Sequence, residues 1–179
     1  MTGRDLKTML FVPASRPERI PKAIASDAGA VIVDLEDAVP EDAKDSARES
    51  LEAFLRGHDG ARIFVRINAR GTAGFEADLA LCARHANVVG IVLPKAESAE
   101  DVRVVAGAGK SIIPLIESAR GLVALNEIAA VPEVERLSYG GLDLSDDLGL
   151  EGNTGAAETV MDQCRYQLLV SSRAAGLLS

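Results

Sequence analysis

Carboxylate side chains closely follow two apolar stretches that have the composition of buried strands. Glu117 ends the run 112–116, and Asp143 follows the run 137–139 after two glycines and a leucine. Carboxylate oxygens without a nearby His or Cys favour Mg²⁺ or Mn²⁺ over Zn²⁺, and Mg²⁺ commonly takes only one or two carboxylates from the protein. The pattern therefore predicts a site for Mg²⁺ or Mn²⁺ at Glu117 and Asp143. The later Asp146 and Asp147 are better explained as capping charges near the start of the following helix.

A second group of charges follows two earlier apolar runs. The motif at 34–37, Asp-Leu-Glu-Asp, places three carboxylates in four residues. It is either a solvated acidic cluster before a helix or a patch that orders metal-bound water or positions a cation. Arg66 shares a strand face with Phe64 and Asn68, since alternate residues of a strand point the same way. Its guanidinium needs an anion, which is either a substrate carboxylate or the 34–37 cluster. Both interpretations can hold, and the substrate role is favoured.

Other residue types with chemical potential have simpler interpretations. Lys95 ends the run 88–93 after a proline, where it could form a Schiff base, but a structural cation beside the acidic residues is favoured. His58 and His85 have no nucleophile near them in the sequence and are interpreted as surface residues. Cys82 and Cys164 have no metal-ligand spacing, and we expect buried, reduced thiols in helices.

The elements that position these residues follow a regular alternation. Short apolar runs rich in β-branched residues recur about every 25 residues, and segments with helical features lie between them. Nearly continuous apolar strands alternating with helices are typical of a parallel sheet covered by helices. The expected strands are 9–12, 30–35, 63–67, 88–93, 112–116 and 137–139, and the expected helices are 16–26, 41–55, 74–85, 98–106, 120–128 and 156–175.

Two α/β architectures fit this alternation, an open doubly wound sheet and a (β/α)₈ TIM barrel. The open sheet usually has a glycine-rich turn after its first strand, whereas the turn here, 13–17, reads Pro-Ala-Ser-Arg-Pro. Polar residues at the ends of several strands favour the barrel, whose active site forms there. A barrel needs eight units and about 250 residues. We therefore expect residues 1–179 to be a single, incomplete barrel domain of about six βα units, without the last two.

The charge balance narrows the classes of partner. With 19 basic and 27 acidic residues the net charge is −8, so binding to nucleic acid or to an anionic membrane surface is not expected. No apolar run reaches the length of a signal peptide core or of a membrane span, which predicts a cytoplasmic protein.

Six motifs, each at the end of an expected strand, resemble the citrate lyase β-subunit / HpcH–HpaI aldolase family. Any one of them would be weak, but their order and their spread over nearly the whole chain are specific. They are LFVPASRP at 10–17, VDLEDAV at 33–39, VRIN at 65–68, LPKAE at 93–97, PLIESA at 114–119, and GLD at 141–143 with DLG at 147–149.

The resemblance implies a homo-oligomeric, Mg²⁺-dependent lyase or aldolase. Such an enzyme cleaves a carbon–carbon bond of a 2-hydroxy acid, often a CoA thioester such as citryl-, malyl- or citramalyl-CoA, and releases a keto acid and an acyl product. Carried over by motif, Glu117 and Asp143 would bind Mg²⁺, and Glu117 would thereby also help to hold the substrate. Glu36 and Asp37 would hold water molecules of the metal.

Two arginines complete the set that the resemblance implies. Arg66 would contact a carboxylate or carbonyl oxygen of the substrate and stabilise the charge of the departing enolate. Arg16 lies where it could face a CoA phosphate, or it could be a solvent-facing residue at the start of a helix. The identity of the general base stays open.

The resemblance also leaves alternatives. Members of the family continue through two more strands and a C-terminal segment, so we expect this chain either to dimerise across the gap or to be marginal in activity. A different hypothesis is a non-catalytic subunit that binds metal and keto acid or serves in assembly. A third, an open sheet that binds a nucleotide, is disfavoured by the missing glycine-rich loop.

Overall fold

The computed structural model describes residues 6–178, which form two compact units. Of the described residues, the first unit contains 6–92 and 107–111, and the second contains 93–106 and 112–178. The expectation of a single domain over 1–179 stays a prediction. Within residues 6–178, no helix is both long enough and apolar enough to cross a membrane.

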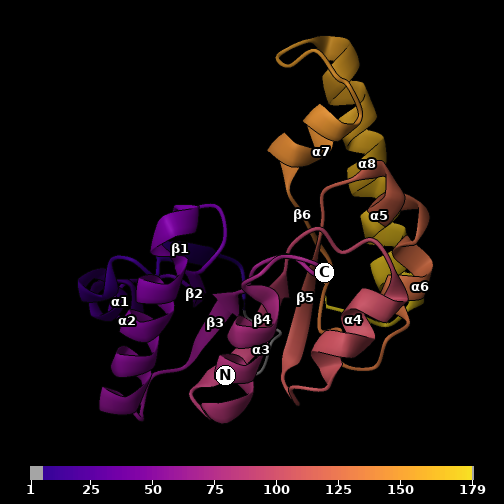
Figure 1. Ribbon diagram of the computed structural model, residues 1–179. Coiled ribbons are helices and arrows are strands. Elements are labelled where there is room, and N and C mark those ends of the chain that lie inside the picture. Colours follow the sequence, from indigo (N-terminus) through magenta and orange to yellow (C-terminus); the bar gives the residue numbers. More distant parts are fainter. Residues whose placement is uncertain (1–5, 179) are drawn as a thin grey trace. The chain divides into compact units, whose positions relative to one another are not determined.

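A parallel sheet forms the centre of the first unit (Figure 1). Its strands are β1 (Met9–Pro13), β2 (Ala30–Asp34), β3 (Ile63–Arg66) and β4 (Val88–Leu93), and each pairs with the next along the chain. The register places Pro13 beside Asp34 and Asp34 beside Arg66. The ends of the first three strands therefore lie level, and the acidic and basic motifs become neighbours.

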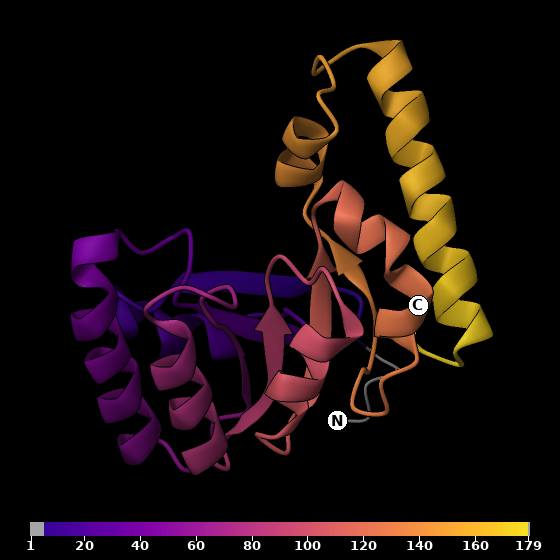
Figure 2. The ribbon, with the colours of Figure 1, turned by 45° about the vertical axis from the view of Figure 1, so that its right-hand side comes forward.

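Helices cover this sheet because their apolar residues recur on one face. They are η2 (Pro17–Arg19), α1 (Ile20–Ile24), η3 (Glu41–Ala43), α2 (Lys44–Gly57) and α3 (Phe75–Arg84). The buried residues of α2 are Ala47, Leu51, Phe54 and Leu55, which have the spacing of an amphipathic helix. The helices α2 and α3 lie side by side in both views (Figures 1 and 2).

The second unit combines short helices with one long one. It contains α4 (Ala99–Ala106), most of β5 (Ser111–Ile116), α5 (Ala119–Val123), α6 (Leu125–Ala129), β6 (Ser138–Tyr139), α7 (Gly141–Asp147) and α8 (Gly155–Ala174). The strands β5 and β6 pair in parallel. The long helix α8 packs against α6 and α7 (Figure 2), and its Met161 and Cys164 form a small core with Leu144 of α7.

Two helical segments differ from the sequence-based expectation. The expected helix 120–128 is divided into α5 and α6 at Ala124, whose N–H donates to the carbonyls of both Arg120 and Leu122 and tightens the turn. The helix α7 was not expected at all. It begins at a glycine and buries only Leu144, so it has no periodic apolar face that could reveal it.

The cysteine prediction is confirmed. Cys82 of α3 and Cys164 of α8 are both free and buried. Burial raises the pKa of the Cys82 thiol to about 12 and also raises the pKa of Cys164, so both stay protonated thiols near neutral pH. They act as small apolar side chains of the core.

The two histidines differ in exposure. His58 is exposed, as expected, and its ring stacks on Phe54 at 4.2 Å between centroids. The side chain of His85 is only 15% exposed, and its Nε2 lies 3.7 Å from Glu52 Oε1. His85 is therefore more buried than the surface position expected of it.

Candidate functional site

Arg66, at the end of β3, is surrounded by carboxylates of the first unit. Its Nε and Nη2 donate to the two oxygens of Asp34 at 2.7 and 2.6 Å, which is a bidentate pair. Its Nη1 lies 3.1 Å from Glu36 Oε2 and 3.5 Å from Asp37 Oδ2. The ring of Phe11 lies 5.0 Å from the guanidinium carbon, within cation–π range. Each nitrogen of the guanidinium thus contacts a carboxylate.

The exposure of these groups differs in a way that matters for chemistry. Asp34 and Glu36 are buried and the side chain of Arg66 is 13% exposed, whereas that of Asp37 is 62% exposed. Burial lowers the pKa of Arg66, but its hydrogen bonds to Asp34 and the charges of Asp34, Glu36 and Asp37 raise that pKa more, so the net shift is upward. The guanidinium stays charged, and its solvent-facing partner is Asp37.

The acidic motif is an ordered turn. Asp34 Oδ1 accepts the backbone N–H of Glu36 at 2.9 Å, and Asp34 Oδ2 accepts that of Ala38 at 3.1 Å. The solvated-cluster interpretation is therefore wrong for Asp34 and Glu36, although it describes the exposure of Asp37. The ion pair that was considered for Arg66 is present, and its substrate role stays a prediction.

Glu117, directly after β5, is the buried carboxylate of the second unit. Its side chain is folded inward, so the residue is only 6% exposed, and its Oε1 accepts the backbone N–H of Lys95 at 2.7 Å. Its Oε2 lies so close to Gly140 that a Cβ atom there would collide with it. Lys95 has a φ of 48°, a left-handed conformation, and its side chain is exposed. In this unit the backbone of Lys95 contacts the carboxylate.

The other aspartates singled out from the sequence, in the segment 143–147, lie on α7. Asp143 is half-buried in its first turn, three residues after Gly140. Asp147, its last residue, accepts the N–H of Ala119 at 2.7 Å. Asp147 is a capping charge, as expected, but it caps α5, because the following helix α8 begins later and is capped by Thr154.

Arg16 lies in the exposed turn after β1. Its side chain is 60% exposed, and Nη1 lies 4.0 Å from Glu18 Oε1. A contact of this length between exposed groups contributes little to stability. The arrangement leaves the side chain in solvent and adds no support for a phosphate site.

Sequence reasoning missed a buried polar network beneath the acidic turn. Lys44 donates to two backbone carbonyls of that turn, and Asp78, which is fully buried, pairs with Arg48 and accepts from Asn68. One signal was present in the sequence. Lys44 begins a helix, where the helix dipole disfavours a cation, so a local partner was to be expected.

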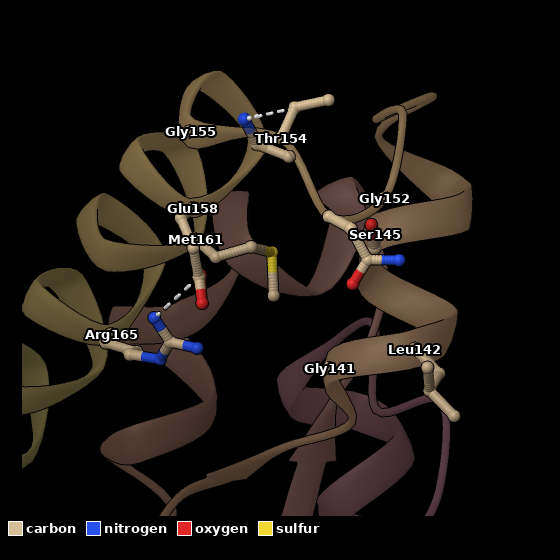
Figure 3. A pocket seen from close by; sticks show the side chains of 11 residues that line it. Gly141, Leu142, Ser145, Gly152, Thr154, Gly155, Glu158, Met161 and Arg165 are labelled. Carbon is tan, nitrogen blue, oxygen red and sulfur yellow. Dashed lines mark hydrogen bonds and ion pairs between the residues drawn. The ribbon is translucent and has the colours of Figure 1, made fainter.

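A pocket of about 720 Å³ lies in the second unit between α7 and α8 (Figure 3). Its lining includes Ser145 of α7 and Met161 and Arg165 of α8, and Arg165 pairs there with Glu158. The residues expected to form the site, Glu117 and Asp143 among them, do not belong to its lining. The predicted metal ligands therefore do not line this pocket, although Leu142 and Ser145, close to Asp143 in the sequence, do.

The donor set of the second unit fits magnesium. Among residues 6–178, no cluster of three or more His, Cys, Asp and Glu side chains is arranged around a common point. Mg²⁺ does not need such a cluster, because it retains water and takes one or two carboxylates. Carboxylates of this kind are the buried Glu117, accommodated only because Gly140 has no side chain, and Asp143, three residues after that glycine in the sequence.

Parallel strands that alternate with helices define an α/β protein, and the charged residues at the strand ends favour the barrel class. The comparisons with known proteins agree. A model of the HpcH/HpaI aldolase/citrate lyase family matches residues 7–179, and the chain belongs to this family. The fold prediction is confirmed by a crystal structure of CitE from Mycobacterium tuberculosis with magnesium, acetoacetate and coenzyme A. It matches with a TM-score of 0.84 and 38% identity over 97% of this chain and 64% of that chain.

Two curated relatives give the same family at the level of sequence. A citrate lyase subunit beta-like protein of Mycobacterium tuberculosis is 41% identical over 173 residues, which are 95% of this chain and 61% of the relative. An L-malyl-CoA/beta-methylmalyl-CoA lyase of Cereibacter sphaeroides is 33% identical over 174 residues, which are 88% of this chain and 54% of the relative. The chain thus spans between half and two thirds of these relatives.

Proposed function

We propose that this chain takes part in the Mg²⁺-dependent cleavage or formation of a carbon–carbon bond in a 2-hydroxy acid or its CoA thioester. The observation that carries the proposal is Glu117, a buried carboxylate beside a glycine that leaves room for it, in a family that includes a malyl-CoA lyase. The related CitE structure that binds magnesium, acetoacetate and coenzyme A supports the same chemical class. Cleavage would release a keto acid and an acyl product, the latter as its CoA thioester where the substrate is one.

The residues have distinct proposed roles. Glu117 and Asp143 would bind Mg²⁺, which when present supplies Lewis acidity to a substrate oxygen. Arg66 would donate hydrogen bonds to an anionic oxygen of the substrate, where a preorganised guanidinium stabilises developing enolate charge. Glu36 and Asp37 would order water and keep Arg66 oriented, and Arg16 would reach a CoA phosphate from its exposed turn.

Product analysis tests the function directly. The chain is incubated with Mg²⁺ and citryl-, malyl- or citramalyl-CoA, and the expected result is a keto acid together with an acyl-CoA, both identified by mass spectrometry. A chelator should stop the reaction. Release of free CoA thiol without a keto acid would contradict the lyase assignment. Solution mass measured on the same sample checks the proposed homo-oligomer.

A second candidate is a non-catalytic chain that binds magnesium and a keto acid. The observation in its favour is that carboxylates of the chain itself already contact every nitrogen of Arg66. Mg²⁺-dependent binding of oxaloacetate, without any product from the thioesters, is the result expected of this candidate.

Gly140→Ala should weaken Mg²⁺-dependent binding of oxaloacetate by about tenfold or more, because a misplaced carboxylate behaves like a lost partner of the metal site. The physical reason is the collision between the new Cβ and Glu117 Oε2. Gly141→Ala is the matched control, since a Cβ at Gly141 would meet its nearest neighbour, Tyr139, at 3.4 Å. Calorimetric titration of both variants measures the effect, and equal affinities would contradict the proposed role of Glu117.

A further inference from the structure

Lys44 is a half-buried cation whose ammonium contacts the acidic turn and Glu41. Its side chain is 12% exposed, and Nζ donates to the carbonyl oxygens of Leu35 at 3.1 Å and of Glu36 at 3.0 Å. The nearest carboxylate partner, Glu41, is 80% exposed and lies 3.9 Å away. Hydrogen bonds from a charged donor to buried carbonyls are stronger than neutral ones. The ammonium is therefore held mainly by the backbone of the turn.

The turn is held from two sides. On one side, the carboxylate of Asp34 accepts the N–H groups of Glu36 and Ala38. On the other side, the ammonium of Lys44 binds the carbonyls of Leu35 and Glu36. The directions of the Glu36 and Asp37 side chains depend on the backbone of this turn. The negative charge of Asp34 and the positive charge of Lys44 therefore together fix where these two carboxylates meet the guanidinium of Arg66.

A second cation of the same helix supports the same place. Leu35 O also accepts from Asn68 Nδ2 at 3.1 Å, and Asn68 Nδ2 donates to Asp78 Oδ2 at 2.6 Å. Asp78 Oδ1 in turn accepts from Arg48 Nε at 2.7 Å. Lys44 and Arg48 are one helical turn apart on α2, so α2 fixes both the turn after β2 and the residues after β3.

We propose that Lys44 is a positioning residue, which holds the turn at 34–38 so that Glu36 and Asp37 orient the guanidinium of Arg66. The inference deepens the proposed function and rests on it only for the consequence at the substrate. The clamp on the turn is a property of the first unit alone.

A lysine that served only the stability of the fold would have a different signature. Its loss would lower the melting temperature and loosen α2 as a whole. The loss of a positioning lysine would loosen the turn selectively and weaken the binding of an anion, and arginine, which keeps the charge and the donors, would restore part of both.

Hydrogen exchange of individual backbone amides tests the clamp without any ligand. In Lys44→Met, the amides of Glu36 and Ala38 are expected to exchange about tenfold faster or more, as for the loss of a charge-assisted hydrogen bond. Amides of Leu51 and Leu55 in α2 should keep their rates. The control Lys22→Met, which removes an exposed lysine of α1, should leave all four unchanged. Unchanged exchange at Glu36 and Ala38, or equal acceleration in α2, would overturn the proposal.

Ligand titration tests the consequence. In the presence of Mg²⁺, oxaloacetate should bind Lys44→Met about tenfold more weakly than the wild type, Lys44→Arg should recover part of that loss, and Lys22→Met should match the wild type. Faster exchange at the turn with unaltered affinity would overturn the role at Arg66. If the wild type itself binds no oxaloacetate, the proposed function fails, and the exchange rates still decide whether Lys44 clamps the turn.

Discussion

Glu117→Gln is expected to abolish Mg²⁺-dependent binding of keto acids. The glutamine keeps the size of the side chain and a carbonyl oxygen that can accept from Lys95 N–H, so the buried hydrogen bond at 2.7 Å can survive. What it loses is the negative charge that Mg²⁺ prefers in a ligand. Loss of an outer partner of a metal site typically costs 10- to 100-fold in affinity, so loss of a direct ligand should cost about 100-fold or more.

Isothermal titration of oxaloacetate, pyruvate and glyoxylate, with and without Mg²⁺, measures this effect. Glu127→Gln is the matched control, because it removes the same charge from an exposed position on α6 of the same unit. We expect heat of binding for the wild type and the control only when Mg²⁺ is present. Unaltered binding by Glu117→Gln would remove Glu117 from the metal site, and binding without Mg²⁺ would remove the metal from the proposal.

The second large effect is expected on stability. Asp34→Ala should lower the free energy of unfolding by about 3–5 kcal/mol, the range for a buried ion pair that loses one partner. Asp34 is 1% exposed, and its carboxylate accepts from the guanidinium of Arg66 and from two backbone N–H groups. The substitution leaves these donors buried and without that acceptor. Urea unfolding followed by circular dichroism gives the change.

A double substitution separates the charge from the packing. Asp34→Ala with Arg66→Met removes both members of the pair, and it should cost less than the sum of the two single substitutions. The control Arg56→Ala breaks an ion pair with Glu52 in which the arginine side chain is 70% exposed, and it should shift the urea midpoint little. Strict additivity of Asp34→Ala and Arg66→Met would contradict a stabilising contact between the two side chains.

Much of the fold could be predicted from the sequence, because apolar β-branched runs and helix signals repeat regularly. The strand 88–93 was predicted with its observed bounds, and the others within one or two residues. The 34–37 cluster was one of the two anions considered for Arg66, and the structure pairs Asp34 with Arg66. For this contact, the residue types and their positions at the ends of neighbouring strands were enough to suggest the ion pair.

The contacts that depend on helices were harder to predict. The position of Lys44 at the start of a helix signals a partner close by, but the local pattern does not show that this partner is the pair of carbonyls of Leu35 and Glu36. Nor does it show that Asp78 is the partner of Arg48, thirty residues away. These pairings depend on how α2 and α3 pack, which no motif encodes. The helix α7 was missed because a seven-residue helix with one buried side chain lacks a periodic signal. The role of Asp147 was attached to the wrong helix for the same reason.

The short helix α7 is held at both ends by hydrogen bonds to other segments of the second unit. At its start, Gly140 N–H donates to Ile116 O at 3.1 Å, and at its end Asp147 accepts from Ala119 N–H at 2.7 Å. Both supports adjoin Glu117, one residue before it and two after it. The backbone at Asp143 is therefore held in place, and if Asp143 binds a cation as proposed, it would adjust to the ion by rotation about its own χ angles. The proposed metal site would then have a nearly fixed backbone, and its fit to cations of different radius would depend on the conformation of a single side chain.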